Sequence, residues 1–235
     1  MWEDALIRLK NPKKRTAASR QWLLRQLNDP YVQAAKAQGY RSRAAFKLEQ
    51  LDDQFHFFKK GQRVVDLGAA PGGWSQVAVK RTLSDKTAGK EKVLGLDLLS
   101  IDPLEGALFL QQDFLTDEGL MALQNALGDD QKVDIVLSDM APSSCGHKKT
   151  DHLRILTMAE AAFDFACFFL RPGGAFITKT LQGGTEISLL KALKHSFQKV
   201  SHAKPKASRK ESAELYLVAL GFRGPVEASQ EETEA

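Results

Sequence analysis

From residue 63 onward, short apolar runs rich in β-branched residues alternate with longer stretches of helical spacing. The runs lie at residues 63–67, 92–97, 107–111, 132–139, 174–179, 197–202 and 215–221. Helical spacing occupies most of the intervals, as at 74–83, 117–127, 154–170 and 186–196. Because parallel strands need crossover helices, this alternation predicts an α/β fold with a seven-stranded, mostly parallel sheet and helices on both faces.

The last connection breaks the alternation. Between the runs at 197–202 and 215–221 stands only "AKPKASRKESAE", which leaves no room for a convincing helix. Antiparallel strands can be joined by a loop, whereas parallel strands need a long crossover. The last strand is therefore expected to run antiparallel to the others.

A further helix is expected before the sheet. Residues 42–55 place an apolar stripe at roughly helical spacing, with Ser42 as the N-cap. Such a helix would pack on the sheet and would carry Lys47 near its apolar stripe.

Positive charge is concentrated at the N-terminal end of the chain. Residues 1–47 contain eleven lysines and arginines and three acids, which gives 11 − 3 = +8, whereas the whole chain carries +4. A segment with a large excess of positive charge is expected to bind a polyanion, although a solvated basic arm has the same composition. We divide the chain into a basic arm (1–30), one α/β domain (31–222) and an acidic, disordered tail (223–235).

The composition excludes several classes of protein. No stretch approaches the roughly 18 apolar residues of a membrane span, and Glu3 and Asp4 near the start disfavour a targeting peptide. Cys145 and Cys167 stand far apart and in no metal-ligand spacing, so neither a disulfide framework nor a metal site is expected. The sequence thus predicts a soluble cytoplasmic protein with no membrane partner, and its uneven charge favours a monomer.

The first strand runs into a glycine-rich turn, in "VVDLGAAPGGWSQ" at residues 64–76. The strand reaches Asp66, and Gly68 and Gly72 follow, where a missing Cβ lets a ligand approach the backbone. Trp74 opens the next helix and could wall the pocket. Ligands of open parallel sheets bind beyond the carboxyl ends of the strands. Because the glycine spacing differs from the pyrophosphate fingerprint, the turn favours a nucleoside-bearing ligand without phosphates.

Two further acids stand at strand ends. Asp97 ends the second strand, where a carboxylate can accept both hydroxyls of a ribose, and Asp113 follows the third, where it could accept from an exocyclic amino group. Each acid alone is more often a turn residue or a helix cap. Together with Asp66 and the glycine-rich turn, they indicate a nucleoside site.

At this point the sequence resembles the FtsJ family of RNA ribose 2'-O-methyltransferases, which have the Rossmann-like class I methyltransferase fold. The resemblance is carried by "DLGAAPGGWSQ", "LDLLSIDP", "QQDF" and "SDMAP" and extends from about Arg20 to Gly221. It implies S-adenosyl-L-methionine as the cofactor. With the turn and strand-end residues included, the expected cofactor site comprises Asp66, Gly68, Gly72, Trp74, Asp97, Asp113 and Asp139.

Methylation of a ribose 2'-hydroxyl also needs a base that removes the hydroxyl proton. Lys179 ends its strand among apolar neighbours, and Asp139 ends the adjacent strand. Glu214 begins the last strand, whose start lies at the same edge if that strand is antiparallel. The resemblance implies a catalytic tetrad of Lys47, Asp139, Lys179 and Glu214. In it, Lys179 is the general base, Asp139 orients it, Lys47 favours its neutral form, and Glu214 fixes the hydroxyl.

The substrate follows from the resemblance alone. It favours a uridine in the A-loop of 23S ribosomal RNA, with the large ribosomal subunit as the partner. A 2'-O-methyltransferase of transfer RNA or another RNA stays open, as does a non-catalytic RNA-binding factor of ribosome assembly. A nicotinamide-dependent dehydrogenase would share Asp97 but not the glycine spacing. Residues 147–152 either contact RNA or form a solvated loop.

Overall fold

The computed structural model describes residues 16–82, 92–142, 145–183 and 187–224. The strands are β1 (Val64–Leu67), β2 (Val93–Asp97), β3 (Ala107–Gln111), β4 (Val133–Ser138), β5 (Leu170–Leu181), β6 (Phe197–Ala203) and β7 (Glu214–Phe222). The helices are α1 (Ala17–Leu27), α2 (Pro30–Gln38), α3 (Ala45–Phe55), α4 (Gly73–Thr82), α5 (Asp117–Leu127), α6 (Lys148–Phe169) and α7 (Ile187–Ser196).

The strands form one seven-stranded sheet in the order β3-β2-β1-β4-β5-β7-β6. All pairs from β3 across to β5 are parallel, whereas β7 runs antiparallel to β5 and to β6. The predicted fold class is therefore confirmed, including the antiparallel last strand. The order reverses between β1 and β4, which is where sheets of this kind bind their ligands.

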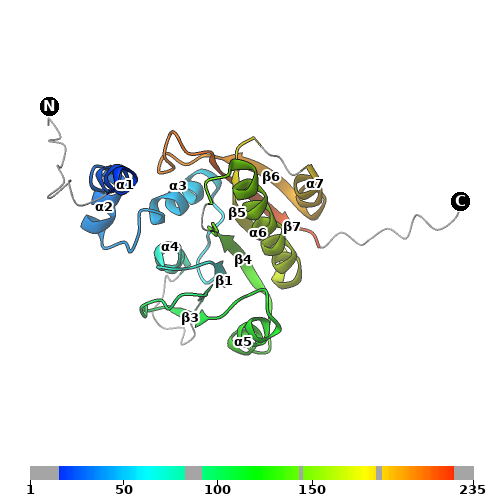
Figure 1. Cartoon of the computed structure of the whole chain (residues 1–235). Coiled ribbons are helices and arrows are strands. Elements are labelled where there is room, and N and C mark those ends of the chain that lie inside the picture. The colour runs from blue at the N-terminus through cyan, green and yellow to red at the C-terminus, as the bar shows by residue number, and fades with distance from the viewer. Residues whose placement is uncertain (1–15, 83–91, 143–144, 184–186, 225–235) are drawn as a thin grey trace, which may run out of the picture.

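Helices cover both faces of the sheet (Figure 1). On one face α3 and α4 pack against the strands, with Leu48 and Val77 in a buried cluster that also holds Ile177. On the other face α5, α6 and α7 contribute Leu123, Phe163 and Leu189 among others to a second cluster. Because helices cover both faces of the sheet, β1 is buried throughout, Asp66 included, and β4 is buried at all but one of its residues.

The start of α3 differs from the prediction. Ala44, not Ser42, is its N-cap residue, and no side chain caps the helix. Residues 42–47 form tight turns in which the amides of Ala45 and Phe46 bond to carbonyls three residues earlier. These turns direct the Ser42 hydroxyl towards Gly73 of α4, where it is buried without a hydrogen-bond partner among the described residues.

The end of α6 agrees with the prediction, but the following strand is longer than expected. The helix ends at Phe169, before Pro172, and β5 begins at once with Leu170. Leu170 pairs with Val133, and a register shift separates this pair from the regular ladder that starts at Ala175. The residues between therefore form an irregular first part of β5, not a separate loop.

The proposed arm and tail lie largely outside the described residues, so their boundaries stay predictions. The described part of the arm contains α1. Asp29, near the end of the arm, caps α2 by accepting a hydrogen bond from the Tyr31 amide. The Asp29 carboxylate is buried and also pairs with Arg43 and Arg209. None of the described helices combines the length and the apolar composition that a membrane span requires.

Candidate active site

Four charged side chains from separate motifs meet at the carboxyl end of the sheet. β4 and β5 are parallel neighbours, so Asp139, directly after β4, and Lys179, near the end of β5, reach the same edge. β7 is antiparallel to β5, and its first residue, Glu214, pairs with Leu181. Lys47 arrives from the buried side of α3. The structure thus brings together all four residues of the predicted tetrad.

The tetrad alternates positive and negative groups. Lys179 Nζ lies 2.7 Å from Asp139 Oδ1, and Lys47 Nζ lies 2.7 Å from Glu214 Oε2. The two cross-pairs are longer, at 3.9 Å between Lys179 and Glu214 and 4.0 Å between Lys47 and Asp139. The side chains are only 9% to 15% exposed. Each charge therefore has an opposite charge beside it in a site shielded from most water, as buried charges require.

Tyr216 is a member of this site that the sequence reasoning missed. Its hydroxyl donates a hydrogen bond to Asp139 Oδ1 at 2.7 Å, and its ring centre lies 5.8 Å from Lys47 Nζ. Complete burial, with the nearby charges of Asp139 and Glu214, raises the pKa of Tyr216 well above its ordinary value, so the phenol remains a donor. The spacing Glu214–Tyr216 places both side chains on one face of β7, which is the signal that could have found it.

Ser208 is a second missed residue. Its hydroxyl donates to Glu214 Oε1 at 2.7 Å, which leaves Oε2 for Lys47. Burial of the Glu214 carboxyl acts to raise its pKa, but Lys47 and Lys179, with the hydrogen bonds from Lys47 and Ser208, outweigh it and lower the pKa. Glu214 is therefore held as a carboxylate. No local sequence signal points to Ser208, because the contact depends on how the β6–β7 loop folds back.

A cavity of about 510 Å³ opens beside Asp139. Three other predicted cofactor residues line it: Gly68, Asp97 and Asp113. The remaining wall is mostly apolar and includes Leu96, Leu98, Leu99, Phe114, Met140, Ala141, Pro142 and Met158. Because Asp139 also belongs to the tetrad, the cavity and the tetrad are two parts of one site at the strand ends.

The two carboxylates on the far side of the cavity are held by backbone amides. Asp97 accepts from the amide of Ala70 through Oδ2 and from that of Leu99 through Oδ1, both at 2.9 Å. Asp113 Oδ1 accepts from the Leu115 amide at 3.0 Å. A carboxylate offers about four acceptor positions, so both groups can still accept from the hydroxyl or amino groups of a ligand.

Packing within the protein also requires the glycines of the turn. Gly68 has a φ of 72°, and a Cβ there would lie 2.3 Å from Cγ of Met140. Gly72 has a φ of 100°, and its Cβ would meet the Arg41 guanidinium at 2.6 Å. At both positions a protein side chain occupies the space that a Cβ would need. The turn requires glycine because of its backbone conformation and this packing, and Gly72 does not line the cavity.

Trp74 and Asp66 also lie away from the cavity wall. The Trp74 side chain is buried in the α3–α4 layer, where its indole nitrogen donates to the carbonyl of Ala44 at 2.9 Å. Asp66 is buried in β1 and accepts from the Ser75 hydroxyl at 2.7 Å. Burial raises the pKa of Asp66 to about 7, and the negative charges of Asp139 and Asp97 act in the same direction against the Ser75 hydrogen bonds.

The sequence profile of the FtsJ-like methyltransferase family matches residues 40–222. The chain belongs to this family. The match contains the whole tetrad and the whole cavity wall, so the resemblance noted on the sequence is confirmed over the folded domain. The protein is accordingly a methyltransferase, and its site must accommodate a methyl donor as well as an acceptor.

Curated relatives and a solved structure extend this result. The chain is 56% identical over 221 residues to the ribosomal RNA large subunit methyltransferase E of Paramagnetospirillum magneticum, covering 94% of this chain and 90% of the relative. It is 55% identical over 218 residues to the protein of the same name from Granulibacter bethesdensis, covering 93% and 91%. A Plasmodium falciparum protein described as a ribosomal RNA methyltransferase superposes with a TM-score of 0.66 at 34% identity, covering 79% of this chain and 100% of that chain.

Proposed function

We propose that the protein transfers the methyl group of S-adenosyl-L-methionine to a ribose 2'-hydroxyl of ribosomal RNA in the large ribosomal subunit. The expected target is a uridine of the 23S A-loop. One observation carries the proposal: Asp139 belongs both to a cavity suited to a nucleoside and to a tetrad suited to removing a proton.

The residues of the cavity fit this donor. Asp97 and Asp113 offer carboxylate oxygens at strand ends, where a ribose and an exocyclic amino group would meet them, and the apolar wall around Phe114 and Met158 suits a flat base. Among the residues that the structure describes, no lysine or arginine lines the cavity, in keeping with a ligand that lacks phosphates. Gly72, just before α4, and Trp74, in its first turn, would contact the cofactor through their backbone groups. The space beside the Cα of Gly72 is filled by Arg41, and the Trp74 indole is bonded to the carbonyl of Ala44.

When bound, S-adenosyl-L-methionine supplies a methyl group already activated by a sulfonium, so the protein has to position the acceptor and remove its proton. In our proposal the amine of Lys179 takes that proton. The ammonium that results has Asp139 Oδ1 at 2.7 Å and Glu214 Oε2 at 3.9 Å, and these carboxylates stabilise the positive charge as it develops.

The other residues hold this arrangement. Lys47 pairs closely with Glu214, at 2.7 Å, and Lys179 lies further from the same carboxylate oxygen, at 3.9 Å. Glu214 therefore interacts with both lysines. Tyr216 holds Asp139 through Oδ1, and the Asp139 carbonyl accepts from Lys179 at 2.8 Å, which limits the movement of the base relative to the cavity. Orientation of this kind accounts for much of the catalysis of a displacement reaction.

The ribosomal substrate is supported by the relatives, which are named ribosomal RNA large subunit methyltransferases. It is also consistent with the basic N-terminal segment, since phosphate neutralisation provides most of the affinity for RNA. His147 and Lys149, at the start of α6, are exposed near the loop that follows Asp139, and their contact with RNA stays a prediction.

The test is to incubate the purified protein with S-adenosyl-L-methionine labelled in the methyl group and large ribosomal subunits from cells that lack it, and then to map the labelled nucleotide. We expect label on a 2'-oxygen of 23S ribosomal RNA, at the A-loop uridine. Label on transfer RNA alone would contradict the substrate, and binding to the particle with no label transferred would favour a non-catalytic assembly factor.

A further inference from the structure

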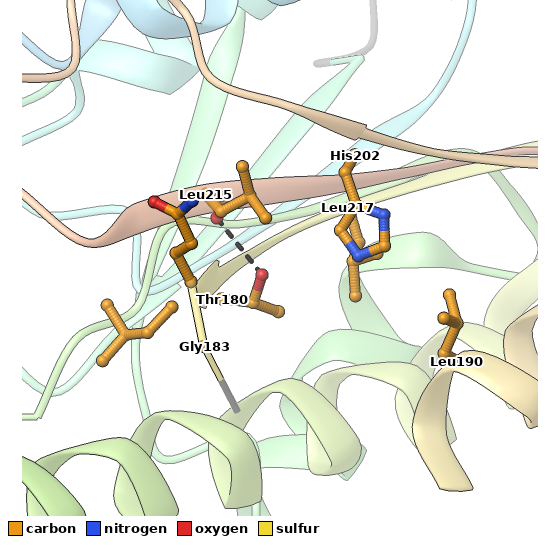
Figure 2. A pocket seen from close by; sticks show the side chains of 8 residues that line it. Thr180, Gly183, Leu190, His202, Leu215 and Leu217 are labelled. Atoms are coloured by element: carbon orange, nitrogen blue, oxygen red, sulfur yellow. Dashed lines mark hydrogen bonds between the residues drawn. The ribbon is translucent and has the colours of Figure 1, made fainter. Parts of the chain in front are cut away.

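A second pocket lies at the same edge of the sheet as the tetrad but on the opposite face. Its volume is about 160 Å³. Leu190, Leu215 and Leu217 supply apolar wall, and Thr180, Gln182 and His202 supply polar groups. Figure 2 shows His202 of β6 and Leu217 of β7 across the pocket from Leu190 of α7. The hydrogen bond from Thr180 of β5 to Leu215 of β7 is drawn as a dashed line beside them.

The pocket and the tetrad are built on the same strands. Lys179 pairs with Tyr216 across the β5–β7 ladder, and the next pair is Thr180 with Leu215. Since side chains alternate between the two faces of a strand, Lys179 points to one face and Thr180 to the other. The pocket is therefore one residue away from the proposed base along β5, at the same carboxyl edge of the sheet as the tetrad.

The segment that contributes Leu190 and His202 to the pocket is strongly basic. Residues 187–210, which include α7, β6 and the start of the β6–β7 loop, contain seven lysines and arginines and no acid. The six lysines of this segment are exposed. Arg209 is the exception, because it is half-buried and pairs with Asp29. Lys191, Lys194 and Lys199 lie on α7 and β6, the elements that contribute Leu190 and His202 to the pocket, whereas the loop after β6 packs over α3 on the tetrad face, where Ala207 contacts Phe46. Lysines on such elements can neutralise the phosphates of an RNA strand.

We propose that this pocket receives the unstacked base of a nucleotide that flanks the methylated one in the RNA strand, an inference that rests on the proposed function. The leucines would contact the faces of the base. The Thr180 hydroxyl is already engaged with the Leu215 carbonyl at 3.4 Å, so the Gln182 amide and the His202 imidazole are the groups that reach the edge of the base. The described lining of the pocket contains no lysine or arginine, which favours a base over a phosphate there.

The test compares His202→Ala and Gln182→Ala with the wild-type protein in steady-state methylation of large ribosomal subunits from cells that lack the enzyme. Both residues are exposed, so neither variant removes a buried contact. The matched control is His195→Ala, an exposed histidine of the same basic segment that does not line the pocket. We expect the KM for the subunit to rise about ten-fold in each pocket variant, the size of one lost base contact, with kcat and the KM for S-adenosyl-L-methionine nearly unchanged.

The outcomes separate this inference from the proposed function. A KM for the subunit that stays at the wild-type value in both pocket variants, while the wild-type protein methylates normally, overturns the base pocket and leaves the proposed function standing. An equal rise in His195→Ala also overturns it, since the effect would then belong to the basic surface in general. A wild-type protein that transfers no methyl group to the subunit overturns both.

Discussion

Asp66 and Glu214 are two carboxyl groups at the same end of one sheet, and their environments shift them in opposite directions. Asp66, in β1, has two other carboxylates and a serine around it, and burial raises its pKa to about 7. Glu214, in β7, is also largely shielded from water, but two lysines and Ser208 lower its pKa. Burial acts alike on both groups, so the nearby charges decide the difference.

The same contrast divides the whole site. On the β1–β3 side, Asp97 and Asp113 are held by backbone amides, and the part of the cavity wall that the structure describes places no lysine or arginine beside them. On the β4–β7 side, Asp139 and Glu214 are paired with Lys179 and Lys47. The first side is suited to accept hydrogen bonds from a neutral part of a ligand, and the second to exchange a proton without leaving a charge unpaired.

The strongest test of this division is the removal of the proposed base. In Lys179→Ala we expect methyl transfer to fall by about three orders of magnitude, because a general base contributes roughly 10²- to 10⁴-fold. Binding of S-adenosyl-L-methionine, measured by calorimetry, should stay within a few-fold of wild type. The matched control is Lys199→Ala, an exposed lysine on β6. Wild-type turnover in a folded Lys179→Ala protein would remove this residue from the mechanism.

A smaller effect, on the KM for the donor and not on kcat, is expected on the β1–β3 side of the site. Asp97→Ala should raise the KM for S-adenosyl-L-methionine by about ten- to one-hundred-fold, the cost of charged hydrogen bonds worth roughly 1.5 to 3 kcal/mol. At saturating donor, kcat should change little. Asp102→Ala, which removes an exposed acid from the connection between β2 and β3, serves as the control and should behave as wild type. A loss confined to kcat in Asp97→Ala would show that the two sides are not separate in function.

The smallest effects concern stability and its pH dependence. A carboxyl whose folded pKa is raised to about 7 favours the folded state at acidic pH, and this contribution is lost as the pH rises through 7. Asp66→Asn should therefore be more stable than wild type above pH 7, by on the order of 1 to 3 kcal/mol. Glu214 has a lowered pKa, so its contribution is present above its ordinary pKa and is lost in acid. Glu214→Gln should be less stable than wild type near neutrality.

Urea denaturation of the two variants from pH 4 to pH 8.5 measures both differences. The free energy of unfolding of Asp66→Asn should pass above that of wild type as the pH rises, and the deficit of Glu214→Gln should shrink as the pH falls. Changes of the same sign at pH 8 would mean that the charges around the two carboxyls do not differ in the way the structure indicates.

Much of this architecture could be predicted from local pattern. The alternation of strands and helices indicated the sheet, and the short link before β7 indicated its antiparallel direction, which is what brings Glu214 to the edge. The rest of the predicted tetrad, Lys47, Asp139 and Lys179, came from the resemblance to the FtsJ family, whose motifs these residues match. Tyr216 was missed because its partner, Asp139, is far away in the chain. Ser208 was missed because its contact with Glu214, although close in the chain, depends on how the β6–β7 loop folds.

The sequence alone determined the fold class, the order of the elements and the residues that arrive at the strand ends, because strand and helix periods are local properties and parallel connections allow few topologies. Only the tertiary structure decided what each of those residues meets. The Cβ direction of Gly68 is filled by Met140, and His202 shares a pocket with Leu190. Asp66 has the negative charges of Asp97 and Asp139 near it, whereas Glu214 has two lysines. Such contacts depend on distances between chain segments that no local pattern encodes, and the charge and burial of each group follow from them.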